Sequence, residues 1–92
     1  MKNNNAQILF EASNFAVVKL PTRRFPGVVI QGDSLSVILD LIYEISESDS
    51  ESEMKETIRE LRGQIEWRIH KYEEVLDANN IPLPYVKPSP RT

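Results

Sequence analysis

Several residue types that common enzyme chemistries need are missing or scarce in this sequence. Its 92 residues contain no cysteine, which excludes disulfide bonds, thiolate catalysis and cysteine-based zinc sites. His70 is the only histidine, and the Gly-x-Ser-x-Gly, phosphate-loop, His-Glu-x-x-His and calcium-loop motifs do not occur. The convergent groups of a catalytic site are therefore largely missing. We expect a protein that is not an enzyme and that uses no cofactor or metal.

Long apolar runs and an excess of basic residues are missing as well. No stretch approaches the roughly 20 apolar residues that cross a bilayer, and the start, Met-Lys-Asn-Asn-Asn, lacks the apolar run of a signal peptide. The 14 acidic and 11 basic residues give a net charge of −3, whereas nucleic-acid binding needs a basic face. The sequence predicts one small cytoplasmic domain over residues 1–92, with no membrane or nucleic-acid partner.

The first third of the chain, residues 6–31, predicts three short strands. Residues 15–20 and 27–31 are rich in β-branched and aromatic side chains, as strands are. The connections between the runs are short, which favours an antiparallel meander. The second and third strands are apolar on both faces, so we expect both faces to be covered or one of them to be an interface.

Two helices are predicted after the strands. The first, over residues 34–46 with Asp33 or Ser34 as its cap, is apolar nearly all round, which predicts a position between the sheet and the second helix. The second, over residues 51–78, would extend roughly 42 Å. A compact domain of this length is only about 30 Å across. The second helix must therefore overhang, bend at Gly63, or pack on a second chain.

The C-terminal residues 81–92 contain four prolines and predict an extended tail. We expect Ile81, Leu83 and Tyr85 to dock on the domain and the chain from Pro88 onward to be loose. The whole pattern predicts an α+β fold, in which a three-stranded antiparallel meander is followed by a two-helix hairpin on one face and an extended Pro-rich C-terminal tail.

Negative charge is concentrated around the acidic connector, residues 46–53, between the two helices. No basic residue occurs between Phe25 and Met54. A helical hairpin would gather six carboxylates at one end of the molecule: Asp40, Glu44, Glu47, Asp49, Glu51 and Glu53. This cluster either keeps the connector solvated or docks a basic protein. Glu44 and Glu47 favour docking, because they lie near the end of a helix whose dipole disfavours negative charge. No ligand spacing in the cluster fixes a metal cage.

Trp67 is the second candidate for partner binding. It projects about 140° away from the apolar stripe of the second helix, on a polar face with Gly63 and His70. Tryptophan is enriched among binding hot spots, so Trp67 would add apolar contact if it shares a surface with the six carboxylates. Two other interpretations are that the Pro-rich tail folds back over the ring, or that the ring is simply exposed.

Three segments resemble a family of small uncharacterised bacterial proteins. They are Phe-Ala-Val-Val-Lys-Leu-Pro at 15–21, Arg-Phe-Pro-Gly-Val-Val-Ile-Gln-Gly-Asp-Ser-Leu at 24–35, and Ile-Pro-Leu-Pro-Tyr at 81–85. The resemblance implies a loose association with polymorphic-toxin immunity proteins. It transfers no catalytic or ligand residue.

The leading hypothesis is a non-enzymatic protein-binding module, a bacterial immunity or inhibitor protein that neutralises a toxin by covering a basic surface. The six carboxylates and Trp67 would form its partner-binding residues. The alternative is a self-assembling structural or adaptor protein that forms a homodimer. A third possibility is a small enzyme with its site around Asp33 and Ser34.

Overall fold

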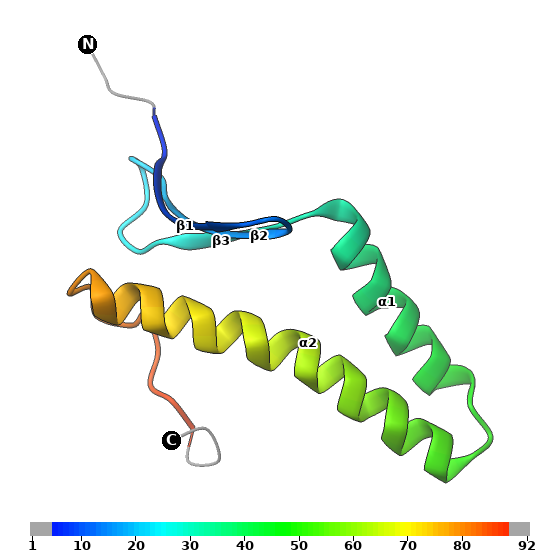
Figure 1. Ribbon diagram of the computed structural model, residues 1–92. Coiled ribbons are helices and arrows are strands. Elements are labelled where there is room, and N and C mark those ends of the chain that lie inside the picture. The colour runs from blue at the N-terminus through cyan, green and yellow to red at the C-terminus, as the bar shows by residue number, and fades with distance from the viewer. Residues whose placement is uncertain (1–4, 89–92) are drawn as a thin grey trace.

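The computed structural model describes residues 5–88 (Figure 1). In chain order its elements are β1 (Gln7–Ala12), β2 (Phe15–Lys19), β3 (Gly27–Ile30), α1 (Gly32–Glu47) and α2 (Glu51–Ala78). Three antiparallel strands are thus followed by two helices, which confirms the predicted α+β fold.

The sheet is a meander with the strand order β1-β2-β3. Phe15 is paired with Ile30, and Val17 lies between Phe10 of β1 and Val28 of β3. Because directly paired residues point to the same side of a sheet, these apolar side chains share one face. β1 and β3 are both edge strands, and β1 contains a register shift between Ile8 and Phe10.

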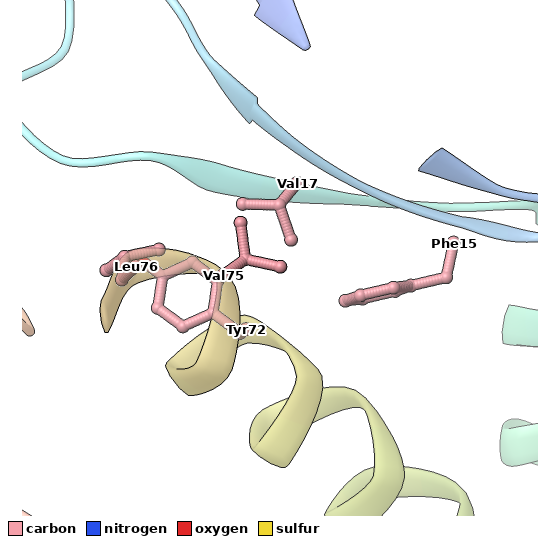
Figure 2. Close-up of a cluster of buried hydrophobic side chains, with 5 residues drawn as sticks. All are labelled: Phe15, Val17, Tyr72, Val75 and Leu76. Atoms are coloured by element: carbon pink, nitrogen blue, oxygen red, sulfur yellow. The ribbon is translucent and has the colours of Figure 1, made fainter. Parts of the chain in front are cut away.

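The hydrophobic core lies between β2 and the C-terminal end of α2 (Figure 2). It consists of five buried residues: Phe15, Val17, Tyr72, Val75 and Leu76. The Tyr72 hydroxyl donates a hydrogen bond of 2.7 Å to the carbonyl oxygen of Pro26, which ties α2 to the connection that precedes β3.

The first part of the tail docks on this core, as the sequence predicts. Ile81, Leu83 and Tyr85 are partly buried against it. The ring of Tyr85 stacks on that of Tyr72 with centroids 6.5 Å apart, and its hydroxyl donates to Glu73 Oε2 at 3.1 Å. The expected loose end lies almost entirely outside the described residues.

The position predicted for the first helix is wrong. α1 does not lie between the sheet and α2. It leads away from the end of β3 and packs along the N-terminal half of α2, while the C-terminal half of α2 lies beneath the sheet (Figure 1). Leu41, 5% exposed, is the buried residue of α1. α2 already covers the central strand β2, and α1 packs on the overhanging part of α2.

α2 runs uninterrupted through Gly63 from Glu51 to Ala78. The sequence left three possibilities for so long a helix: an overhang, a bend at Gly63, or packing on a second chain. In the single chain, α2 stays unbent and its N-terminal half extends beyond the sheet. The molecule measures 57 × 30 × 20 Å, and its radius of gyration of 16.2 Å exceeds the roughly 12 Å of a compact chain of this length.

Both ends of α2 follow from local sequence. Ser50 is the N-cap, and its side chain accepts a 3.3 Å hydrogen bond from the backbone N–H of Glu53, as capping serines do. At the other end Asn80 has a φ of 58°, and the N–H of Ile81 donates to the carbonyl of Leu76 at 2.9 Å. This is a Schellman stop with asparagine in the left-handed position.

The predicted cap of α1 is wrong, because the helix begins at Gly32 with Gln31 as its N-cap. The carbonyl of Gln31 accepts the N–H of Leu35 at 3.0 Å, while its side-chain amide donates to the carbonyl of Ser13 at 2.8 Å. Gln31 is thus held by the β1–β2 turn and starts the helix from there. Asp33 accepts only the neighbouring N–H of Ser34, at 2.8 Å.

Replacing the buried hydroxyl gives a first test of the core. We expect Tyr72→Phe to lower the free energy of unfolding by about 1–2 kcal/mol at neutral pH, since the carbonyl of Pro26 loses its donor. Urea unfolding of both proteins measures the difference. An unchanged stability at neutral pH would contradict the role given to this hydrogen bond.

The same pair of proteins tests the titration of Tyr72. Burial raises the pKa of its hydroxyl above the ordinary value of 10.0, because desolvation disfavours the phenolate. A group whose pKa is raised on folding contributes stability that is fully present below the unfolded pKa and lost as the pH rises through the folded pKa. The gap between wild type and Tyr72→Phe should therefore narrow above about pH 10. A gap that stays constant there would contradict the assignment.

Candidate functional site

The connector between α1 and α2 forms the end of the helical hairpin that is farthest from the sheet (Figure 1). Four of the six candidate carboxylates lie in or directly beside this connector, and Glu44 and Asp40 lie about one and two turns further back along α1. We call the six residues together the acidic tip: Asp40, Glu44, Glu47, Asp49, Glu51 and Glu53. All six residues are exposed. Among residues 5–88 only Glu51 of the six forms an ion pair, with Lys55 at 3.2 Å. The structure thus leaves all six carboxylates facing solvent on the part of the hairpin that extends away from the sheet.

Serine side chains hold the connection between the two helices. The Ser48 hydroxyl donates to the carbonyl of Ser50 at 3.1 Å and accepts the N–H of Ser50 at 3.2 Å. With Ser50 capping α2, the serines satisfy the local backbone and the carboxylates are not needed for that purpose. The last turn of α1 contains no basic residue, so nothing on that turn offsets the unfavourable position of Glu44 and Glu47.

Trp67 lies at a different place, beside the sheet. Its side chain is 46% exposed, and its ring meets Phe15 edge to face with centroids 5.4 Å apart. The guanidinium of Arg68 lies 6.0 Å from the ring centroid. The tail, as far as the structure describes it, docks around Tyr72 and Glu73 instead. Phe15, and not the tail, is therefore the aromatic cover of Trp67.

Trp67 and the acidic tip do not form one surface. Trp67 follows Glu53 by fourteen positions along α2, which corresponds to about 21 Å of helix rise. The structure therefore does not bring the tryptophan together with the carboxylates, and any contact through Trp67 uses a second region of the molecule.

A groove between the sheet, α1 and α2 was not identified from the sequence. It has a volume of about 320 Å³, and its lining includes Val28 and Ile30 of β3, Ile38 of α1, and Ile65, Ile69 and Tyr72 of α2. The groove exists because α2 covers only part of the sheet. Val17 is 0% exposed, whereas Val28, its direct partner on the same face, is 46% exposed. In the sequence, the feature that points to this groove is that β3 is apolar on both faces.

Arg68 lies in the wall of this groove and is only 8% exposed. Its Nη1 donates to the backbone carbonyl and the side-chain oxygen of Gln64, at 2.8 and 3.0 Å, but Nε has no hydrogen-bond partner. No carboxylate within the described chain forms an ion pair with Arg68. Burying a cation without an anion is costly, so this groove wall can accept a carboxylate from outside.

The position suggested for a small enzyme has a simpler role. Asp33 is exposed at the first turn of α1, where it accepts the N–H of Ser34. The hollow beside it is lined by apolar residues of α1, among them Leu35, Leu39 and Ile42, and by no carboxylate. Nothing at this place favours the enzyme alternative.

A family model matches residues 1–85, nearly the whole chain. The chain belongs to the family of unknown function DUF6959. No curated protein and no solved structure matches it. Membership of DUF6959 confirms the resemblance to an uncharacterised family and provides no link to toxin immunity proteins.

Two general properties of the described chain bear on the site of this DUF6959 member. Within residues 5–88 neither helix is long and apolar enough to cross a membrane. Over the same residues no group of three or more histidine, aspartate or glutamate side chains could hold a metal ion.

Gly63, one turn before Trp67, provides a test of the face on which both lie. A Cβ built at Gly63 would meet no atom within 4 Å, and its φ is not positive. We expect Gly63→Ala to raise the free energy of unfolding by about 0.5–1 kcal/mol, since alanine favours a helix interior over glycine. Thermal and urea unfolding measure this change. A destabilised variant would contradict the open surface described here.

Proposed function

We propose that this protein is a non-enzymatic, cytoplasmic protein-binding module that docks a basic partner on its acidic tip. The observation that carries the proposal is the placement of six exposed carboxylates on the part of the hairpin that extends beyond the sheet. Five of the six have no ion pair within the described chain. Their charge is therefore available to a partner.

The electrostatics of the tip support docking over simple solubility. A surface of one sign accelerates the encounter with an oppositely charged protein and rejects partners of like charge. Placing Glu44 and Glu47 near the C-terminal end of α1 costs about 0.3–1 kcal/mol each. If the carboxylates only kept the protein soluble, this cost would be unnecessary, because carboxylates within residues 48–53 would serve that purpose equally well.

In its more specific form the proposal describes an immunity-type inhibitor that neutralises a toxin by covering a basic surface. The small size, the acidic tip and the absence of a catalytic constellation in the sequence support this form. A chain of this kind acts by occlusion, so it needs complementary charge and shape and no reacting group.

The test is a charge reversal at the tip with a matched control. A partner is first captured from the native host with the wild-type chain. The triple variant Glu44→Lys, Glu47→Lys, Asp49→Lys should then slow association about tenfold or more and weaken its dependence on salt, since the steering charge is reversed. Stopped-flow or surface-binding kinetics at several salt concentrations measure both quantities.

The control changes the same number of charges elsewhere. Glu11→Lys, Glu60→Lys, Asp77→Lys alters three exposed carboxylates outside the acidic tip and gives the same net charge as the tip variant. If both triples slow association equally, net charge alone is responsible and the tip is not the docking surface. Unchanged kinetics in the tip variant would also refute the proposal.

The self-assembling alternative also has an observation in its favour, because apolar side chains on α1, α2 and β3 are about half exposed. On α1, Leu35, Leu39 and Ile42 lie on the opposite side of the helix from the carboxylates of the acidic tip. Self-assembly through these side chains is therefore compatible with docking of a basic partner.

A further inference from the structure

The groove continues into a larger apolar surface on the hairpin. We call this the apolar face: Val28 of β3, Leu35, Leu39 and Ile42 of α1, and Ile58 and Ile65 of α2. These six side chains are between 44% and 56% exposed. Ile38 lines both the groove and the neighbouring hollow along α1, so the two are parts of one surface.

The chain exposes more surface than a compact chain of the same mass, because it is elongated, with a long axis of 57 Å. The accessible surface is 7077 Å², whereas a folded monomer of 10.6 kDa exposes about 5,500 Å². The excess is about 1,600 Å². Even half of it equals the roughly 800 Å² that each partner loses in a standard protein–protein interface. The apolar face is where burial would gain most, because monomers rarely expose large contiguous apolar patches.

The shape of the face suits a second copy of the same chain. A two-fold interface requires one surface that is complementary to itself. The apolar face contains both halves of such a contact, because the stripe of Leu35, Leu39 and Ile42 stands beside a groove of about 320 Å³. A copy turned by 180° can lay its stripe along the groove of the first copy and receive the first copy's stripe in return.

The charges of α1 do not take part in this contact. α1 contains four acidic residues, Asp33, Asp40, Glu44 and Glu47, and no basic one, and all four lie on the opposite side of the helix from Leu35, Leu39 and Ile42. They therefore do not reach the guanidinium of Arg68 in the groove, which has no carboxylate partner in the described chain. The contact with a second copy is an apolar one.

From these observations we propose that the protein forms a two-fold symmetric dimer through the apolar face, with α1 of each subunit packed along the groove of the other. The interface leaves the acidic tip uncovered. Around α1, Asp40, Glu44 and Glu47 lie about 140° from the centre of the stripe formed by Leu35, Leu39 and Ile42. The dimer is thus a separate proposal from the docking of a basic partner.

The first experiment measures molar mass by light scattering and sedimentation from about 1 µM to about 500 µM. The wild-type chain should reach twice its monomer mass of 10.6 kDa. Leu39→Glu should weaken the dimer about 100-fold or more, because two carboxylates would be buried at the interface. Val37→Glu is the matched control, since Val37 is similarly exposed but lies on the acidic side of α1, and it should leave the dimer intact.

Two outcomes of that experiment overturn the proposal. One is a wild-type chain that remains at 10.6 kDa up to the highest concentration, which would leave the apolar face to a different protein. The other is a dimer that survives Leu39→Glu or dissociates with Val37→Glu, which would place the interface elsewhere.

A second measurement covers the case in which Leu39→Glu fails to fold. Because the chain has no cysteine, a single introduced thiol reports on one position. At concentrations that favour the dimer, the thiol of Leu39→Cys should react with a maleimide at about one tenth of its monomer rate or more slowly still, since association shields the thiol. The thiol of Val37→Cys should react at a constant rate. Equal behaviour of the two thiols would refute the proposed interface.

Discussion

A small sheet has to support a helix about twice its length, and most of the structure follows from this mismatch. The longest strand, β1, has six residues and extends about 20 Å, whereas the 28 residues of α2 extend about 42 Å. Only the C-terminal half of α2 can therefore pack on the sheet, where Tyr72, Val75 and Leu76 meet Phe15 and Val17. The other half extends into solvent and depends on α1 for cover.

α1 covers one side of the overhanging helix and leaves its own remaining surface exposed. Leu41 faces inward and is buried, whereas Leu35, Leu39 and Tyr43 are at least half exposed. The same geometry leaves the face of β3 partly open, since Val17 of β2 is 0% exposed whereas its partner Val28 of β3 is 46% exposed. The groove and the apolar face are therefore consequences of one packing arrangement, and the hairpin end with its carboxylates is the part of that arrangement farthest from the core.

The sequence predicted the elements better than their arrangement, for physical reasons. Helix ends are set by local chemistry, so Ser50 and Asn80 mark the start and stop of α2 without any tertiary information. The tail residues Ile81 and Leu83 were identified because isolated apolar side chains among prolines gain by docking. The position of α1 was wrong because periodicity shows which sides of a helix are apolar and does not show which of them the same chain covers. Gln31 was missed as the N-cap because its role depends on a carbonyl in the distant β1–β2 turn.

The candidate site could likewise be predicted only in part from the sequence. The acidic tip follows from a hairpin and a run of charge, both visible in the sequence. Trp67 required tertiary information, since its contact with Phe15 joins residues far apart in the chain. The buried position of Arg68 was not identifiable either, because an arginine on a helix is ordinarily exposed.

A core of five buried residues provides little stability for a chain of this length. Any partner that binds the folded chain and not the unfolded chain adds to that stability in proportion to the logarithm of its concentration. A second copy is the partner that is always present when the protein is, and burial of the apolar face would supply the missing hydrophobic contact. The acidic tip lies on another side of α1, so self-association would stabilise the hairpin that presents the carboxylates and leave them free to meet a basic protein. The two proposed surfaces thus have different tasks, one in holding the fold and the other in selecting what binds to it.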